Sequence, residues 1–448
     1  MREMKDSGIE WVGSIPAHWK THPVYYYFGE SKNKNRFGQE NNLLSLSYGK
    51  IVRKDINTSD GLLPESFNTY NIVAANDIII RPTDLQNDKR SLRTGLVRER
   101  GIITSAYICL RPIKEIDSRF FNYLLHAYDV IKVFYNMGNG VRQGLNFSEF
   151  SRLLVFEPPV NKQKKIADYL DAKCAEIDAL TADIQAQIDT LEQYKRSVIT
   201  ETVTKGLDPD AEMKDSGYDW VGMMPSTWVM RKGKYMFAQR SLRGNSIELQ
   251  LLSPTQKFGV IPQSMYEELT GMSAVKLNEK ADLSMLKTIH KGDFCISLRS
   301  FQGGFEYSEY EGVVSPAYQV FYPTVEIADG YYRYLFKESG FIEKMNSYTM
   351  TLRDGKNIAF ADFGNTYIPS PPVGEQAAIA TYLDDRCARI DAIIADKRKQ
   401  MEVIDEYKKS MIFEYVTGRI FSTVRLRAEA APEEISLLRV TSLSIIRL

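Results

Sequence analysis

The chain is poor in the residues with which proteins bind metals or form disulfides. Its 448 residues include only four cysteines and four histidines, and the cysteines stand singly at positions 109, 174, 295 and 387. Without a CxxC pair, neither a disulfide framework nor a zinc site is expected. The sequence predicts reduced thiols, which fit a cytoplasmic protein.

Long apolar runs and net charge are also lacking. No run of about 18 apolar residues occurs, and the opening MREMKDSGIEW has no apolar signal core, so no membrane span is expected. Lys plus Arg and Asp plus Glu both number 57, which disfavours nucleic-acid binding through bulk charge. Binding to DNA would depend on where the charges lie, or on a partner that adds positive surface.

Motifs of common catalytic sites are missing as well. There is no GxxxxGK[ST] phosphate loop, and the two Pro-Pro pairs, in EPPV and SPPV, lack the neighbours that an amino-methyltransferase motif needs. Asp210 and the Glu212-Met213-Lys214 run imitate a nuclease signature but stand too close together to come from two strands. The sequence therefore predicts no catalytic residues, no metal site and no cofactor bound by this chain.

What the sequence does contain is an internal repeat. MKDSGIEWVGSIP, from Met4, returns as MKDSGYDWVGMMP, from Met213, with nine of 13 positions identical. A longer repeat pairs residues 163–204 with 376–417, where 21 of 42 positions are identical. Between these copies, GIITSAYICLRP is weakly similar to GVVSPAYQVFYP, and NDIII to GDFCI. The chain is thus predicted to run twice through a short segment, a globular half and a helix.

The long repeats predict helices of coiled-coil type, because their apolar residues recur about every 3.5 positions. At 1.5 Å per residue, about 40 residues make a rod of roughly 60 Å whose apolar stripe needs a partner. If the halves are related by a pseudo-twofold axis, the two helices run antiparallel with a globular head at each end. The stripe is predicted at Ile166, Leu170, Cys174, Ile177, Leu180, Ile184, Ile188, Leu191, Tyr194 and Val198, and at Ile379, Leu383, Cys387, Ile390, Ile393, Met401, Ile404, Tyr407 and Met411.

The globular halves predict an α+β fold with a mixed or antiparallel sheet. Runs such as NIVAANDIII and GVVSPAYQVF are typical of strands, whereas residues 121–138 and 330–347 predict amphipathic helices. All four tryptophans lie in or beside the short repeated segments, where packing is the expected role.

The predicted boundaries are 1–157 for the first segment and head, 158–205 for the first long helix, 206–370 for the second segment and head, 371–420 for the second long helix, and 421–448 for a tail of unknown role.

The doubled arrangement resembles the specificity (S) subunits of type I restriction–modification systems. The resemblance rests on KDSGxxWVGxxPxxW before each head and QxxIAxYLD…C…IDA…YKxS…VT after it, and it covers residues 4 to about 420. It implies two target-recognition domains, joined by two long antiparallel coiled-coil helices that act as a spacer, with a pseudo-twofold internal repeat.

The same resemblance implies partners. Double-stranded DNA would be recognised as a bipartite target, two methyltransferase subunits would dock on the helices, and restriction subunits would join the complex. S-adenosylmethionine, ATP and Mg²⁺ would be used by those partner subunits and not by this chain.

Candidate DNA-binding residues are cations and amides in basic or glycine-rich stretches, because recognition needs donors and acceptors at base edges and cations at phosphates. In the first head they lie in NDKRSLRTGLVRER and NGVRQGLNF, and in the second in SLRSFQGG and TLRDGKN. The predicted residues are Lys89, Arg90, Arg93, Arg98, Arg142, Gln143, Asn146, Arg299, Gln302, Arg353, Lys356 and Asn357.

Other interpretations of the sequence stay open at this point. A stand-alone DNA-modifying enzyme would need a catalytic motif, and a purely structural coiled-coil protein would not need polar loops at matching places in both heads. An S subunit that no longer assembles is a third alternative.

Overall fold

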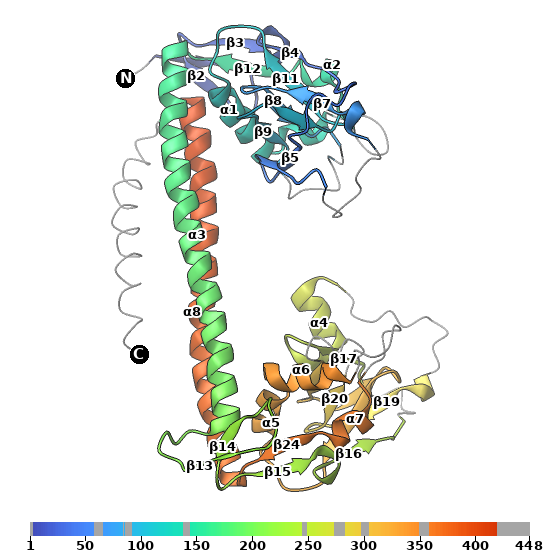
Figure 1. Cartoon of the computed structure of the whole chain (residues 1–448). Helices are drawn as coiled ribbons and strands as arrows, with labels where there is room; N and C mark the ends of the chain where they lie inside the picture. The colour runs from blue at the N-terminus through green and yellow to red at the C-terminus, as the bar shows by residue number, and fades with distance from the viewer. Residues whose placement is uncertain are drawn as a thin grey trace. The chain divides into compact units, whose positions relative to one another are not determined.

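The computed structural model describes residues 3–57, 66–83, 85, 92–137, 144–243, 249–272, 283–296, 304–348 and 358–418. The chain forms two compact units (Figure 1). Unit 1 comprises residues 1–183 and 399–448, and unit 2 comprises residues 184–398. Two long helices, α3 (Val160–Lys205) and α8 (Val373–Thr417), each pass from one unit into the other.

The head of unit 1 is made of short antiparallel strands. Its largest sheet has the order β4-β11-β8-β9, and the remaining strands pair as β1-β2, β3-β12, β5-β6 and β7-β10. Helix α1 (Ser118–Val130) lies against β9. The strands are β1 (Met4–Asp6), β2 (Ser14–Pro16), β3 (Lys20–Pro23), β4 (Phe28–Glu30), β5 (Leu44–Ser47), β6 (Lys50–Arg53), β7 (Asn71–Val73), β8 (Ile78–Ile80), β9 (Thr94–Leu96), β10 (Gly101–Ile103), β11 (Ile108–Pro112) and β12 (Leu154–Glu157), with a short helix α2 (Phe147–Phe150).

The head of unit 2 repeats every one of these pairings. Its largest sheet has the order β16-β23-β20-β21, and the other strands pair as β13-β14, β15-β24, β17-β18 and β19-β22. The strands are β13 (Met213–Asp215), β14 (Met223–Pro225), β15 (Val229–Lys232), β16 (Phe237–Arg240), β17 (Leu252–Thr255), β18 (Gly259–Pro262), β19 (Lys287–Ile289), β20 (Phe294–Ile296), β21 (Phe305–Tyr307), β22 (Gly312–Val314), β23 (Gln319–Pro323) and β24 (Tyr367–Ser370). Its helices are α4 (Gln263–Thr270), α5 (Asp329–Leu335), α6 (Ser339–Ser347) and α7 (Phe360–Asn365). The weak sequence similarity between the halves therefore reflects one topology used twice.

Two pairs of matched residues, one in each weakly similar stretch, explain why some sequence similarity remains between the two heads. A Cβ atom at Gly101 would lie 2.5 Å from the carbonyl oxygen of Asn42, and one at Gly312 would lie 2.4 Å from that of Gln250, so only glycine fits at either place. Asp77, at the start of β8, accepts two hydrogen bonds from the guanidinium of Arg111 on β11, at 2.9 and 2.6 Å. In unit 2, the matching Asp293 accepts two hydrogen bonds from Arg240, at 2.7 and 2.9 Å, but this arginine lies on β16, the counterpart of β4.

The predicted amphipathic helices are present but interrupted. In unit 1, α1 ends at Val130, and Lys132 adopts a left-handed backbone conformation with a φ of 66° before a short 3-10 turn. In unit 2, the buried Glu338 separates α5 from α6 and caps the second helix by accepting a hydrogen bond from the amide of Phe341 at 2.7 Å. Apolar periodicity continues across both breaks, so the pattern alone did not reveal them.

Within each unit, the two long helices run antiparallel. In unit 1 the rings of Tyr169 and Tyr415 stack with centroids 4.3 Å apart, and further along α3 Asp178 forms an ion pair with Lys408. In unit 2 Lys195 forms an ion pair with Asp391 at 2.6 Å. Asp178 with Lys408 and Asp391 with Lys195 are the same pair in the two repeats, because each helix supplies the aspartate to one pair and the lysine to the other.

The apolar stripe of both helices is confirmed. Most of its predicted members are buried, whereas Tyr194 is 43% exposed and Ile394, which was not predicted, is buried. Tyr194 lies at the edge of the stripe, where its hydroxyl accepts a hydrogen bond from the Arg386 guanidinium at 2.7 Å. The buried members are Ile166, Leu170, Cys174, Ile177, Ile184, Ile188, Ile379, Leu383, Cys387, Ile390, Ile404 and Met411.

The repeated segments pack against the far ends of the long helices. Trp19 and Trp228 are 2% and 0% exposed, which confirms a packing role for these two tryptophans. A Cβ atom at Gly206, just after α3, would lie 3.4 Å from the ring of Trp228, and one at Gly418, just after α8, would lie 2.9 Å from the ring of Trp19. Each segment therefore covers the end of the helix that belongs to the other repeat.

A matched glutamine joins each head to the start of a long helix. The side chain of Gln163 accepts a hydrogen bond from the amide of Asp117 at 2.9 Å and donates one to the carbonyl of Pro158 at 2.8 Å. The side chain of Gln376 makes the same two bonds, at the same distances, with Ala328 and Pro371. Both glutamines are buried, so their polar groups are satisfied only while head and helix stay joined.

Candidate nucleic-acid interface

Most of the residues predicted to bind DNA fall in two connections that come at matching points in the order of elements of the two heads. One connection joins the third and fourth strands of the large sheet, β8 to β9 in unit 1 and β20 to β21 in unit 2. The other precedes the strand that leads into each long helix, β12 or β24. Nine of the predicted residues belong to these connections and lie outside the described residues: Lys89, Arg90, Arg142, Gln143, Arg299, Gln302, Arg353, Lys356 and Asn357. Their contact with DNA stays a prediction.

The prediction for Arg93 needs a correction. Its side chain is 0% exposed, and one guanidinium nitrogen donates to the backbone carbonyls of Arg81 and Thr83. Its own backbone amide donates to the buried carboxylate of Asp129 on α1. Arg93 therefore holds the start of β9 against α1, and a fully buried guanidinium does not present donors to a DNA surface.

Asn146 serves first as a helix cap. Its side-chain oxygen accepts a hydrogen bond from the amide of Glu149 at 3.0 Å, and the Glu149 carboxylate accepts one from the amide of Asn146 at 3.2 Å. This reciprocal pair is a capping box that starts α2. The side chain is exposed, but the observed bonds explain its residue type without DNA.

Arg98 is the described candidate that remains available to DNA. Its side chain is 76% exposed, and a guanidinium nitrogen lies 3.9 Å from the Asp171 carboxylate on α3. At that distance an exposed ion pair contributes little, so a phosphate could replace the carboxylate at small cost. Arg98 also lines a cavity of about 540 Å³ in unit 1.

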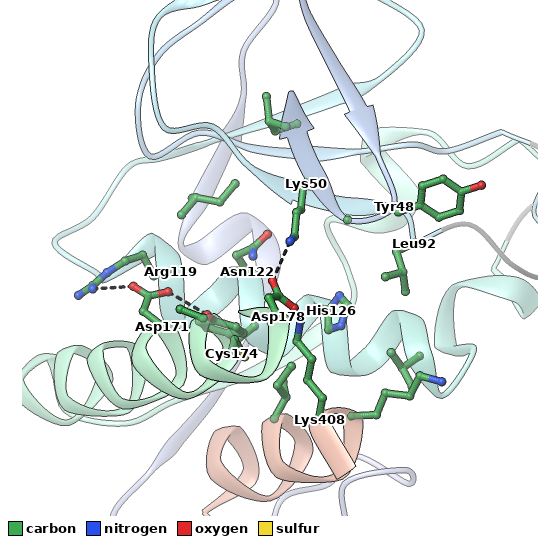
Figure 2. A pocket seen from close by; sticks show the side chains of 18 of the residues that line it. Tyr48, Lys50, Leu92, Arg119, Asn122, His126, Asp171, Cys174, Asp178 and Lys408 are labelled. Carbon is green, nitrogen blue, oxygen red and sulfur yellow. Dashed lines mark hydrogen bonds and ion pairs between the residues drawn. The ribbon is translucent and has the colours of Figure 1, made fainter. Parts of the chain in front are cut away.

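The cavity brings together residues that the sequence did not single out. Figure 2 shows Lys50 and Lys408 converging on Asp178, with Asn122 and His126 of α1 beside them. Lys50 follows Tyr48-Gly49, the turn between β5 and β6, and comes 128 residues before the aspartate that it contacts. The Tyr-Gly turn is the one local signal for this hairpin, and no local pattern indicates a partner so distant in sequence.

His126 is kept uncharged by its surroundings. Burial, together with the ammonium groups of Lys408 and Lys409, lowers the pKa of its imidazole from 6.5 to about 4, against an opposing contribution from Asp405. The imidazole is therefore neutral at pH 7 in the folded protein. In the unfolded chain it would take up a proton near its ordinary pKa.

We expect unit 1 to lose stability on acidification because of His126. Between pH 6.5 and pH 4 the unfolded state binds the additional proton, so the free energy of unfolding falls as the pH falls. From pH 7 to pH 5 the loss due to this side chain is roughly 2 kcal/mol. Hydrogen exchange of α1 measured at both pH values in the wild type and in His126→Leu checks this, since the variant should lose roughly 2 kcal/mol less. An equal loss in both proteins would contradict the role of His126.

The described residues offer no metal or reactive thiol site. No group of three His, Cys, Asp or Glu side chains comes together as metal ligands would in the part of the chain that the structure describes. Burial raises the pKa of the Cys174 and Cys387 thiols, which keeps both protonated and agrees with their place in the apolar stripe. Among the described helices, none is long and apolar enough to cross a membrane.

Comparison with known proteins gives a consistent result. The family model of the type I restriction modification DNA specificity domain matches residues 28–190 and again residues 232–403. The MjaX and MjaVIII type I restriction enzyme specificity subunits of Methanocaldococcus jannaschii are each 25% identical to the chain, over 70% and 72% of it and 71% and 75% of their own lengths. A solved chain from work on complex assembly and conformational transition of the type I R-M system has a TM-score of 0.63 at 12% identity, covering 91% of this chain and 99% of its own.

The two matches of one domain model, on two heads of one topology, define the class of protein. The chain belongs to the type I restriction–modification DNA specificity family. It is the DNA-recognition subunit of a type I restriction–modification system, with two globular domains and two long antiparallel helices as the resemblance implied.

Proposed function

We propose that each head recognises one half of a split DNA sequence, and that the helix pair seats two adenine methyltransferase subunits. The observation that carries the proposal is that the sequence identity between α3 and α8 includes exposed residues. Buried identity between α3 and α8 is explained by packing, but exposed residues are also identical at matched positions. Tyr169 and Tyr382 are 36% and 42% exposed, and Asp183 and Asp396 are both exposed.

An exposed tyrosine repeated at the same place suits a protein partner. Tyrosine is enriched at interfaces because its ring supplies apolar area and its hydroxyl a hydrogen bond. One such tyrosine in each unit supports two equivalent seats. Restriction subunits would join through the assembled complex. We propose no catalysis by this chain, so that S-adenosylmethionine, ATP and Mg²⁺ would be used by the partner subunits.

The expected stoichiometry is two methyltransferase subunits per chain. Co-expression followed by native mass measurement checks this, because the seats occur twice. Loss of a central interface tyrosine typically weakens binding by about 2 kcal/mol or more. Tyr169→Ser or Tyr382→Ser should therefore give a one-to-one complex at concentrations that saturate the wild type, and the double variant should bind neither subunit.

Tyr25→Ser is the control for these variants. Tyr25 is an exposed tyrosine of the first head, 55% exposed, which lies outside the helix pair. Its replacement should leave both subunits bound. A one-to-one wild-type complex at saturating partner would contradict the two-seat proposal, and failure to bind any methyltransferase subunit would contradict assembly itself.

Independent recognition by the two heads has its own test. Arg353 and Lys356 belong to the second head only, so replacing both by Ala should relax the recognised sequence in one half-site and leave the other unchanged. Single-molecule sequencing of methylated adenines gives the motif of each variant. Relaxation of both half-sites together would show that the heads do not act separately.

A further inference from the structure

The cavity of unit 1 lies where the first head meets both long helices. It is lined by the β5–β6 hairpin, by α1, and by the parts of α3 and α8 that belong to unit 1 (Figure 2). Asp178 ties the hairpin to both long helices, because it accepts from Lys50 at 2.7 Å and also pairs with Lys408. A cavity of about 540 Å³ is large enough for a small ligand or for a group that projects from a larger one.

Among the side chains that line this cavity, cations outnumber carboxylates. Five cationic side chains line it, against three carboxylates, and His126 adds no charge at pH 7. Carboxylates outside the lining pair with two of these cations, Asp117 and Asp168 with Arg119, and Glu406 with Lys409. Lys50 shares Asp178 with Lys408, and Arg98 lies 3.9 Å from Asp171, which also accepts from Arg119. The lining charges are Lys50, Arg98, Arg119, Lys408 and Lys409, with Asp171, Asp178 and Asp405.

Two of the cations reach solvent at the edge of the cavity. The side chains of Arg98 and Lys50 are 76% and 67% exposed. Arg98 also belongs to the basic stretch NDKRSLRTGLVRER, and Leu92 of the same stretch lines the cavity. One of the two exposed cations at the cavity edge therefore belongs to the segment that is predicted to contact DNA.

We propose that Lys50 and Arg98, at the edge of this cavity, bind one phosphate of the DNA backbone. The proposal rests on DNA recognition by the first head. A phosphate there would pair with Arg98, which lies 3.9 Å from Asp171, and with Lys50, which shares its carboxylate with Lys408. It would position the head on the duplex without reading sequence. The contact involves the hairpin and the loop between β9 and β10, so it is separate from the base-contacting loops.

The second head does not repeat this arrangement. β9 and β10 correspond without a gap to β21 and β22, which places Glu309 at the position of Arg98. Glu309 lies 3.6 Å from Arg333 and brings negative charge where unit 1 has positive charge. The phosphate contact is thus a property of unit 1 alone, and the two heads hold the DNA backbone differently.

The test compares two double variants of the full chain in its complex with methyltransferase subunits. Lys50→Gln with Arg98→Gln removes the two cations at the cavity edge. Arg53→Gln with Arg100→Gln is the matched control, because these cations come from the same hairpin and loop, are 71% and 61% exposed, and do not line the cavity. Binding is measured from 50 to 200 mM salt on a duplex that carries the methylated motif and on one that lacks it.

The cavity variant should bind both duplexes about tenfold more weakly, and its slope of log affinity against log salt should be shallower by about 0.9, the value for one phosphate. Its methylation motif should be unchanged, and the control should match the wild type. Equal behaviour of the two double variants, or a relaxed motif with an unchanged salt slope, would overturn the phosphate contact. A wild-type complex without preference for the motif would instead contradict DNA recognition.

Titration with inorganic phosphate separates a backbone contact from a site for a free anion. Calorimetry on the wild-type complex should show no binding of inorganic phosphate with a dissociation constant below 1 mM, which corresponds to a binding free energy of about −4 kcal/mol. The proposal would be overturned if inorganic phosphate bound with a dissociation constant below that threshold, if Lys50→Gln with Arg98→Gln abolished this binding, and if both duplexes still bound as before. The cavity would then be a site for a free anion.

Discussion

Four residues inserted at facing positions of both long helices should lengthen the gap in the recognised DNA sequence by one or two base pairs. Facing positions lie between Asp178 and Gln187 in α3 and between Lys397 and Lys408 in α8, as the bonds between these residues show. Four helical residues add about 6 Å, and base pairs stack at about 3.4 Å. They also complete one turn to within about 40°, so the apolar stripe stays nearly in register.

Two inserted residues are the matched control. They would turn the stripe beyond the insertion by about 200°, so Ile184 and Ile394 could no longer face the other helix. We expect this variant to lose sequence recognition altogether. The motif of methylated adenines measures both outcomes. If the four-residue variant stays active with an unchanged gap, the helices do not set the spacing.

Removal of Trp228 should lower the free energy of unfolding by about 3–5 kcal/mol. The ring is fully buried beside Gly206, its indole nitrogen donates to Glu375 at 2.9 Å, and its edge meets Tyr331 with centroids 6.2 Å apart. Trp228→Ala leaves a cavity in a fully buried region, and it removes the indole donor from the Glu375 carboxylate. Trp19→Ala should behave similarly in unit 1, where the ring stacks on Phe156 with centroids 5.6 Å apart.

Trp11→Ala provides the comparison for these two variants. Trp11 belongs to the same repeated segment but is 38% exposed, so its removal should cost no more than about 1–2 kcal/mol. Urea denaturation followed by circular dichroism measures all three variants. A loss below that of Trp11→Ala for either buried tryptophan would mean that its segment does not hold the end of the long helix.

The sequence predicted the repeat and the helix pair because both depend on local patterns. Apolar spacing near 3.5 identified the stripe, and most of its predicted members are buried. The breaks at Lys132 and Glu338 could not be predicted in this way, because each depends on a backbone or capping interaction that leaves the apolar period intact.

The candidate site was predicted less completely. A basic stretch indicated a DNA-binding loop, but it did not separate Arg93, whose guanidinium meets backbone carbonyls, from Arg98, whose side chain reaches solvent. The two arginines differ because the backbone of Arg93 is bonded to α1, whereas Arg98 lies in the loop after β9. Lys50 and Lys408 were missed because they meet at Asp178 across 128 and 230 residues of sequence.

The placement of Trp19 against Gly418, and of Trp228 against Gly206, makes the linear order of the two halves arbitrary. The segment that begins at residue 213 covers the end of the helix that directly precedes it in the chain, whereas the segment that begins at residue 4 covers the end of a helix that comes some 400 residues later. A circular permutation that joins residue 418 to residue 4 through a copy of residues 206–212, and opens the chain between the repeats, would keep every contact described within each unit. The position of the chain ends would then decide which half-site is recognised by the first head along the chain, and the fold of the two units would not.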